Sequence, residues 1–491
     1  MNAAAARLRK YLKQGDASRA LHWHGVAVLL PVTFCFVLTH LALLVGLTIG
    51  NAVSSVCLLA VVIGSAFAIY VSPDRRGTAV SLVVALVATI VLLAGIEDKS
   101  GDHYYHETVQ YLAGGWNPVF DARAETIHTF ESRITSFPKG PLITATPLPV
   151  LTGRILDARW PNVFLLVAGA LISVGILTSI CAWPRRLVWL VALGLSSNSI
   201  VVSQLSSLYV DGQLALVIQL VVLFLAKRLS AGSLSSLEKV TFAFILAYGL
   251  VIKHSSGPYL FVLVAGAIFI AGRIRKPVTR AELKGTILAG LISAVLFGLN
   301  PYVSNTIIYG SPLYPMLAPN MHYSYEDNGQ VPNDLLKKSR VGRFVLSTLA
   351  ETHVFPDTVR IKLPFEVHGR ELRYLNSTDN RVGGFGPLFS GLLLASLVSI
   401  TILGMRKRLS LPLLGLTAVV LVSVFINPEP WWSRFVPQLW LVTFIPLIGV
   451  ELKGHKDFAR LRNEWLISVP AVIAIANASL YLAIQCFAPA S

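Results

Sequence analysis

The chain has 491 residues and a formal net charge of +16, yet only 13% of its residues are charged and 54% are hydrophobic. Soluble proteins carry about 25% charged residues, so the composition excludes an ordinary soluble enzyme. Apolar runs recur along the chain, each near the roughly 20 residues that cross a bilayer as a helix. They predict an all-α polytopic membrane protein.

Thirteen apolar segments are predicted to span the membrane. Glycine and proline mark most of the turns between them, and two connections, 96–161 and 304–386, are long. The chain is thereby divided into 1–95 with three spans, a first outer loop at 96–161, six spans in 162–303, an outer subdomain at 304–386 and four spans in 387–491. In chain order the spans are 24–48, 52–71, 77–95, 162–182, 187–204, 208–226, 240–253, 258–272, 284–303, 387–405, 411–427, 434–450 and 465–487.

Lysine and arginine gather in the short loops on one side of these spans, which marks that side as cytoplasmic. The N-terminus is therefore expected inside, with the C-terminus and both long loops outside. Because the positive charge is explained by topology, it does not indicate a nucleic-acid partner. The residues are Arg7, Arg9, Lys10, Lys13, Arg19, Arg75, Arg76, Arg185, Arg186, Lys227, Arg228, Lys239, Arg273, Arg275, Lys276, Arg280, Lys284, Arg406, Lys407, Arg408, Lys453, Lys456, Arg460 and Arg462.

The first outer loop is predicted to be partly helical. Asp102 can cap a helix that runs through Gln110 and stops at Gly114-Gly115. Asp102, Tyr105 and His106 lie about one helical turn apart on one face of that helix. Residues 120–134 suggest an amphipathic helix on the membrane surface, and a re-entrant or short helix follows Phe137-Pro-Lys-Gly-Pro141 through Leu151.

Charged groups also stand at the short outer turns. Asp211 opens the sixth span, Lys253 and His254 link the seventh and eighth, and Arg434 follows Trp431-Trp432. Most acidic residues lie in the two long loops or at such turns, so chemistry that needs carboxylates belongs on the outer face.

These segments resemble the GT-C superfamily of integral-membrane glycosyltransferases, in particular its bacterial branch that uses polyprenyl-phosphate sugars. The resemblance extends from about residue 20 to 450. It rests on the order of the segments and on their all lying on the same side of the membrane. The similar segments are Asp102-His-Tyr-Tyr-His106, Gly115-Trp-Asn-Pro118, Pro138-Lys-Gly-Pro141, Tyr209-Val-Asp-Gly212, Lys253-His-Ser-Ser-Gly257 and Tyr309-Gly-Ser-Pro-Leu-Tyr-Pro315.

The resemblance implies transfer of a sugar from a lipid-phosphate carrier to a glycan, lipid or protein acceptor on the outer face of a bacterial inner membrane, facing the periplasm. Carried over by position, the catalytic base is Asp102. Contacts to substrate and donor fall to Tyr105, His106, Lys139, Tyr209, Asp211, Lys253, His254, Tyr314 and Arg434.

The sequence does not decide whether such a protein uses a metal ion. The adjacent acidic pair of some branches is absent, because His103 follows Asp102. A divalent cation such as Mg or Mn usually needs more than one hard oxygen ligand, so no metal ligand is assigned. The four cysteines, Cys35, Cys57, Cys181 and Cys486, lie in or beside predicted spans, which favours packing over a disulfide or a metal site.

The chemistry of lipid-linked transfer points to the same residues independently. A cation must stabilise the leaving phosphate, and Lys253, His254 and Arg434 stand at the boundary where it would lie. A carboxylate must take the proton of the acceptor in an inverting displacement, which suits Asp102. Tyr105, Trp116, Trp431 and Trp432 are aromatic residues for stacking on sugars or anchoring at the interface.

Each residue also has a structural interpretation. In that interpretation Asp102 only caps its helix, His106 forms a structural hydrogen bond, and Glu107 is solvated or salt-bridged. Asp211 pairs with Arg154, Arg159 or Lys253; Lys253 extends to the headgroups; Arg434 packs on the tryptophans, which are interfacial anchors.

Two other functions compete with the glycosyltransferase. A transporter or flippase would place charges near the middle of its spans, where this sequence has almost none. A polymerase or ligase of the O-antigen type would concentrate arginines in a large outer loop. Loop 304–386 does hold Arg340, Arg343, Arg360, Arg370, Arg373 and Arg381, so that alternative is retained.

Overall fold

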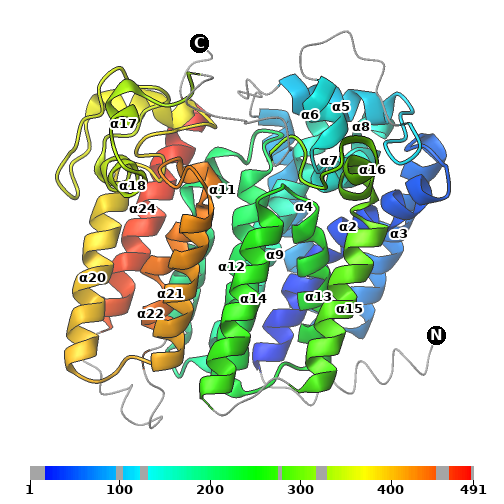
Figure 1. The fold of residues 1–491 in the computed structure, drawn as a ribbon. Helices are drawn as coiled ribbons and strands as arrows, with labels where there is room; N and C mark the ends of the chain where they lie inside the picture. The colour runs from blue at the N-terminus through cyan, green and yellow to red at the C-terminus, as the bar shows by residue number, and fades with distance from the viewer. Residues whose placement is uncertain are drawn as a thin grey trace.

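A computed structural model of the protein describes residues 17–95, 103–121, 131–274, 279–316, 329–448, 450 and 464–487. Long helices stand side by side in one bundle, and the shorter helices gather at one of its ends (Figure 1). No strand occurs in the described parts of the chain; only isolated bridges do. The chain is thus an all-α membrane protein.

Seven of the described helices are long and apolar enough to cross a membrane. They are α2 (Ala17–Leu44), α3 (Asn51–Val71), α4 (Arg75–Gly95), α9 (Trp160–Ile180, extended by η1, Ile155–Arg159), α12 (Asp211–Ala231), α14 (Ser256–Arg273) and α24 (Trp465–Phe487). Shorter helices complete the bundle: α10 (Arg185–Ser196), α13 (Ser236–Leu250), α15 (Arg280–Leu296), α20 (Phe389–Met405) and α21 (Leu411–Ile426).

Three predicted spans differ from the structure. The span predicted at 187–204 is interrupted at Ser197 and Asn198, which separate α10 from the short helix at Ser199–Ser203. The helix predicted at 284–303 ends at Leu296, and the chain then bends by 80° into η2 (Leu299–Val303) and α16 (Ser304–Tyr309). Pro301 explains the break, because proline cannot donate to a helix ladder. The segment 434–450 is not one α-helix; it consists of η4 (Ser433–Phe435), η5 (Pro437–Thr443) and α22 (Ile445–Ile448). Pro437 and Pro446 interrupt it.

The first long loop forms a cap of short helices over one half of the bundle end (Figure 1). α5 (His103–Ala113) ends as predicted: Gly115 has a φ of +98°, a conformation in which glycine is favoured. α6 (Glu131–Ser136), α7 (Gly140–Ala145) and α8 (Pro147–Thr152) follow. Of the amphipathic helix predicted at 120–134, residues 122–130 lie outside the described chain.

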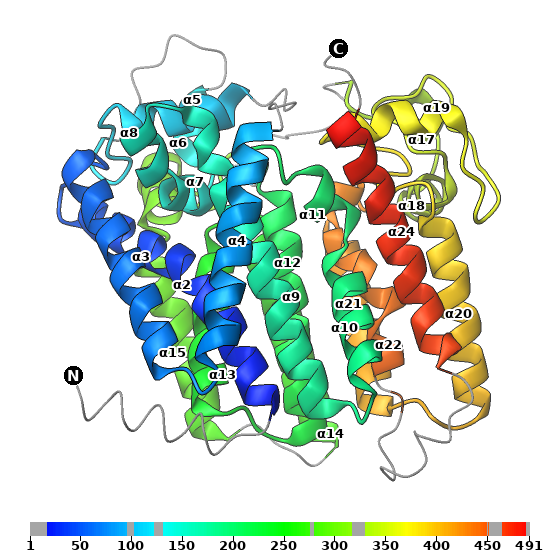
Figure 2. The ribbon, with the colours of Figure 1, turned by 180° about the vertical axis from the view of Figure 1, so that it is seen from behind.

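The second long loop forms a subdomain over the other half of the same end. It contains α17 (Asn333–Leu336), α18 (Arg340–Leu349), α19 (Gly369–Leu372) and η3 (Arg373–Asn376), with bridges Ala350–Ile361 and His353–Val382. Seen from behind, it stands over α20 and α24, and α24 lies between α20 and α10 (Figure 2). The short α11 (Ser199–Ser203) lies between the two caps.

The basic helix ends lie at the opposite end of the bundle. Arg75 and Arg76 begin α4, Arg185 and Arg186 begin α10, and Arg228 lies in the last turn of α12. Figures 1 and 2 show that these helix ends face away from α5–α8 and from α17–α19. The bundle therefore has one basic end and one end covered by caps.

Candidate functional site

An ionic cluster lies at the capped end, where α12 begins. Asp211 is the first residue of α12 and is fully buried. Its Oδ1 is 2.6 Å from Nζ of Lys253, which lies in the turn between α13 and α14, and its Oδ2 is 3.8 Å from Nη1 of Arg434 in η4. Of the three partners suggested for Asp211, the structure therefore selects Lys253.

The outer subdomain adds a second carboxylate and a third cation to the cluster. Oδ1 of Asp379 lies 3.0 Å from Nε of Arg434 and accepts a hydrogen bond of 2.8 Å from the indole N–H of Trp432. Its Oδ2 lies 3.6 Å from Nε of Arg381. The charges thus alternate from Lys253 through Asp211, Arg434 and Asp379 to Arg381, and we call these five residues the ionic cluster.

Aromatic rings enclose the cations of the ionic cluster. The guanidinium of Arg434 lies 5.0 Å from the ring centre of Tyr209, 4.8 Å from Trp432 and 5.3 Å from Phe435. Arg381 lies 4.4 Å from Trp432, and Nζ of Lys253 lies 4.3 Å from Phe435. These distances are in the range of cation–π attraction, so the rings hold the cations while excluding water.

Gln204, which follows α11, positions the start of α12. Its Oε1 accepts a 2.8 Å hydrogen bond from the backbone N–H of Gly212, and its Nε2 donates to the carbonyl of Thr378 at 3.3 Å. A side chain at Gly212 would meet the α11 backbone at 3.2 Å, so glycine permits this close approach. Asp211 also stands at the positive end of the α12 dipole, which favours its charge.

Burial works against the cations of the ionic cluster. It lowers the pKa of Lys253, Asp211 opposes this effect, and the charge of Arg434 adds to it. Burial likewise lowers the pKa of Arg381, against the attraction of Asp379. Among the described residues the ionic cluster holds three cations and two carboxylates, so one positive charge is in excess.

The first-loop helix reaches this cluster through Tyr105. The ring of Tyr105 meets that of Tyr209 edge-on at 5.8 Å, and both side chains are buried. His106, the next residue of α5, is half-buried. Glu107 is also half-buried, and its Oε2 is enclosed without a hydrogen bond. Asp102 lies outside the described residues.

Lys139 and His254 belong to a separate polar site between α6, α7 and η2. Nζ of buried Lys139 donates to the carbonyls of Thr135 and Phe137 at 2.9 and 2.8 Å, and to Oδ1 of Asn300 at 2.6 Å. Thr135 is in the last turn of α6, so Nζ of Lys139 binds one of the carbonyls that a helix leaves free at its C-terminus. Burial lowers the pKa of Lys139 to about 7. This arrangement indicates a structural role.

His254 faces that polar site although it follows Lys253 directly. Its ring lies 5.4 Å from the ring of Phe137 and 5.9 Å from that of Tyr302. Burial lowers the pKa of His254 to about 4, so the imidazole is neutral near pH 7. The turn therefore sends Lys253 into the ionic cluster and His254 away from it.

Several predicted aromatic residues have other environments. Tyr314 stacks on Tyr309 with ring centres 3.8 Å apart. Trp431 and Trp432 are 2% exposed, so the interpretation of both as interfacial anchors is wrong. Trp116 is buried as well, and its indole N–H donates to the carbonyl of Asp121 at 3.2 Å.

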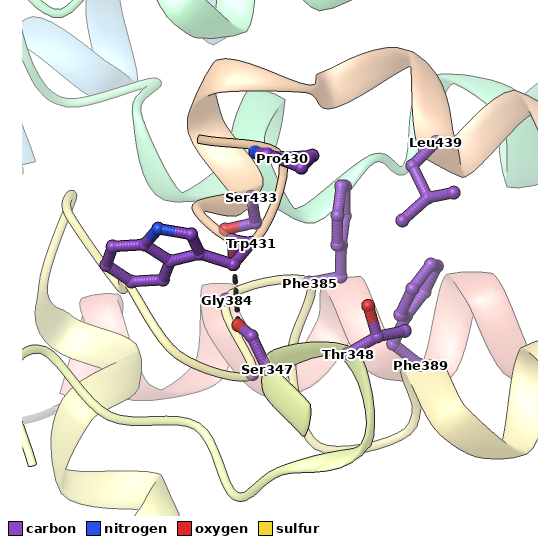
Figure 3. Close-up of a pocket in the computed structure, with 10 residues that line it drawn as sticks. Ser347, Thr348, Gly384, Phe385, Phe389, Pro430, Trp431, Ser433 and Leu439 are labelled. Carbon is purple, nitrogen blue, oxygen red and sulfur yellow. Dashed lines mark hydrogen bonds between the residues drawn. The ribbon is translucent and has the colours of Figure 1, made fainter. Parts of the chain in front are cut away.

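A small pocket lies behind the segment that carries Arg434. Ser347 and Thr348 of α18, Phe385, Phe389, Trp431 and Ser433 are among its lining residues (Figure 3). The hydroxyl of Ser347 donates to the carbonyl of Trp431 at 2.7 Å, and that of Ser433 donates to the carbonyl of Asn380 at 3.2 Å. Because both hydroxyls bind backbone, these two hydrogen bonds hold the segment that leads into η4 against the subdomain.

Sequence reasoning missed Asp379 and Gln204 as site residues and listed Arg381 only among the loop arginines. The one signal for Asp379 and Arg381 was the polar run from Asn376 to Arg381, shortly before Gly383-Gly-Phe-Gly386. Such a run is common in exposed loops, so it does not identify a site.

The carboxylates of the ionic cluster do not fit a divalent cation. Asp211 and Asp379 each face Lys or Arg nitrogens, and Mg²⁺ would need those same oxygens. Across the described residues, no three His, Cys, Asp or Glu side chains gather as metal ligands.

Comparison with known proteins assigns no family to this chain: no protein-family model matches it, and no curated protein matches it.

Proposed function

We propose that the protein is a membrane glycosyltransferase of the GT-C type, which transfers a sugar from a polyprenyl-phosphate carrier to a glycan, lipid or protein acceptor on the outer face. The observation that carries the proposal is the ionic cluster at the capped end of the bundle, with Lys253, Arg381 and Arg434 held by aromatic rings and carboxylates. A half-buried site of fixed cations suits a leaving phosphate, whose developing charge it stabilises without reorganisation.

The excess charge of the cluster supports a monophosphate carrier. A sugar joined to a lipid through one phosphate is a diester with a single negative charge, which the one excess positive charge balances. A diphosphate carrier, as in the polymerase or ligase alternative, has two. Other arginines of the outer loop are engaged elsewhere: Arg340 donates to the carbonyls of Phe425 and Asn427, and Arg370 pairs with Glu351.

The proposed setting is a bacterial inner membrane, with the capped end facing the periplasm. In this topology the shorter helices and the segment Pro437–Ile448 cross the membrane together with the seven long helices, which makes thirteen spans. The charges of the cluster stand at helix ends rather than in the middle of spans, which argues against a transporter.

In the proposed reaction Asp102 is the general base of an inverting displacement. Asp102→Asn keeps the size and much of the capping ability of the side chain, and we expect a rate lower by about 10²–10⁴-fold. The measurement is transfer from a polyprenyl-phosphate sugar by the purified, folded variant. Glu107→Gln, on the same helix but a different face, is the control and should retain activity. Activity of Asp102→Asn within a few-fold of the parent would show that Asp102 only caps α5.

Donor binding tests the role of the ionic cluster separately from the base. Arg434→Gln removes the central cation, and we expect at least about a 10-fold weaker affinity for the polyprenyl-phosphate donor, since charge-assisted hydrogen bonds contribute about 1.5–3 kcal/mol. Lys337→Gln, an equal change of charge at the exposed residue that follows α17, is the control. Equal donor affinity of the parent and Arg434→Gln would contradict the assignment of the ionic cluster to the phosphate.

A further inference from the structure

A segment of the outer subdomain exposes four large apolar side chains. The exposed fractions are 58% for Ile361, 68% for Leu363, 49% for Phe365 and 40% for Val367. The chain turns within this segment, where the backbone N–H of Glu366 donates to the carbonyl of Leu363 at 3.2 Å. A contiguous group of exposed apolar side chains marks a surface that contacts a membrane or a partner.

Lys362 points inward between these side chains and fixes the segment to the bundle. Its Nζ pairs with Glu371 at 2.6 Å and donates to the carbonyl of Pro387 at 2.7 Å, just before α20 begins. Its backbone N–H donates to the carbonyl of Leu349 at 3.2 Å. Because Lys362 and Glu371 are both buried, the segment is held with its apolar face outward.

Phe365 joins this face to the surface of α20. A side chain at Gly391, in the first turn of α20, would lie 2.4 Å from the Phe365 ring, so the ring packs on the bare backbone there. Phe365 has a φ of +70°, a strained conformation for a bulky residue. Farther along α20, Leu394 and Leu397 are exposed as well. The apolar face is therefore continuous with the lateral surface of a bundle helix.

We propose that residues 361–367 are a membrane anchor, which we call the apolar loop. Ile361, Leu363, Phe365 and Val367 insert into the leaflet that surrounds the capped end of α20. Both views place the stretch between α18 and α19 at the outer edge of the molecule, beside that end of α20 (Figures 1 and 2). The continuity with α20 selects the bilayer as the partner, because the same lipids that cover α20 reach the loop.

The anchor has a consequence for the ionic cluster. Glu371, the partner of Lys362, lies in α19, and η3 leads from there to Asp379 and Arg381. An apolar loop inserted in the leaflet therefore sets the depth at which these two residues lie. The anchor itself does not depend on the reaction that the protein catalyses.

Spin labelling of the full chain in lipid vesicles tests the anchor. Leu363→Cys and Val367→Cys are labelled in a Cys486→Ser background, which removes the exposed cysteine; the other three are buried. The vesicles contain phosphatidylcholine and phosphatidylglycerol. We expect each label to collide several-fold more often with oxygen, which concentrates in the bilayer, than with a water-soluble nickel chelate. Lys337→Cys, at the exposed residue that follows α17, should show the reverse preference.

Two results would overturn the anchor. Labels at Leu363 and Val367 as accessible to the nickel chelate as the label at Lys337 would place the apolar loop in water. Labels shielded from both reagents would show that another protein or a second copy of the chain covers it.

Discussion

Asp211 shows at the scale of single residues why the ionic cluster holds together. A lone carboxylate at the head of a membrane helix is costly, and this one is fully buried. Lys253 and Arg434 compensate its charge, while Gln204 approaches its Oδ2 at 3.5 Å. In return, the carboxylate of Asp211 compensates the positive charges of Lys253 and Arg434.

Removal of the Asp211 charge should therefore destabilise the protein. Asp211→Asn leaves the half-buried Lys253 beside a neutral amide, and we expect the free energy of unfolding to fall by about 3 kcal/mol. Asp379→Asn, at a partly exposed carboxylate, should cost about 1 kcal/mol. Thermal unfolding in detergent micelles measures both. Adding Lys253→Met to Asp211→Asn should restore part of the loss; equal losses in the two single variants would contradict this account.

Lys139 should make stability depend on pH. Burial lowers its pKa from 10.5 in the unfolded chain to about 7 in the folded protein. Between these values the unfolded chain binds more protons, so stability from this group rises with pH. It is greatest above pH 10.5 and is lost as the pH falls toward 7.

The measurement for Lys139 is the melting temperature of the parent and of Lys139→Gln between pH 7 and 10. We expect the parent to gain stability relative to the variant as the pH rises. Parallel pH profiles would show that Lys139 keeps an ordinary pKa in the folded protein.

Reciprocal close contacts join α2 and α9 at the scale of elements. A side chain at Gly175 of α9 would lie 2.7 Å from the backbone nitrogen of His22, and one at Gly25 of α2 would lie 2.6 Å from Ile172. Small residues let membrane helices approach closely, where van der Waals packing replaces the hydrophobic effect as the driving force. Glycine at these positions is therefore a requirement of packing.

Gly175→Ala should separate the two helices. The added methyl group meets backbone, which cannot move aside as a side chain can, and we expect a loss of about 1–3 kcal/mol in the free energy of unfolding. Gly290→Ala in α15, where a methyl group meets nothing within 4 Å, is the control and should be neutral or slightly stabilising. The free energy of unfolding in micelles should be lower for Gly175→Ala than for Gly290→Ala. Equal stability of the two variants would contradict the close packing of α2 and α9.

The sidedness of the whole molecule is testable by cysteine labelling in intact cells. With Cys486→Ser as background, a membrane-impermeant maleimide should label Lys337→Cys, just after α17. It should label Ser233→Cys, between α12 and α13, only after the membrane is opened. The physical reason is the positive-inside rule acting on the basic helix ends. Labelling of Ser233→Cys in intact cells would reverse the topology and place the ionic cluster in the cytoplasm.

The sequence by itself determined the positions of most bundle helices, because apolar length is a local property that needs no tertiary contact. α3, α4, α20, α21 and α24 begin and end within about two residues of their predicted bounds, inside the usual uncertainty of helix ends. Two of the failures, after Leu296 and at Pro437–Ile448, fall where proline interrupts an apolar run whose average composition hides the break. The third, within 187–204, falls where Asn198 ends one helix and caps the next.

Only the tertiary structure decided which outer-turn groups meet. Lys253 and Asp211 are 42 residues apart, and Trp432 and Asp379 are 53 apart, and no periodicity links such positions. His254 shows the limit most sharply, since it follows Lys253 yet faces a different site. The direction of a side chain at a turn depends on how the surrounding helices pack, and hydropathy and charge counts carry no information about that packing.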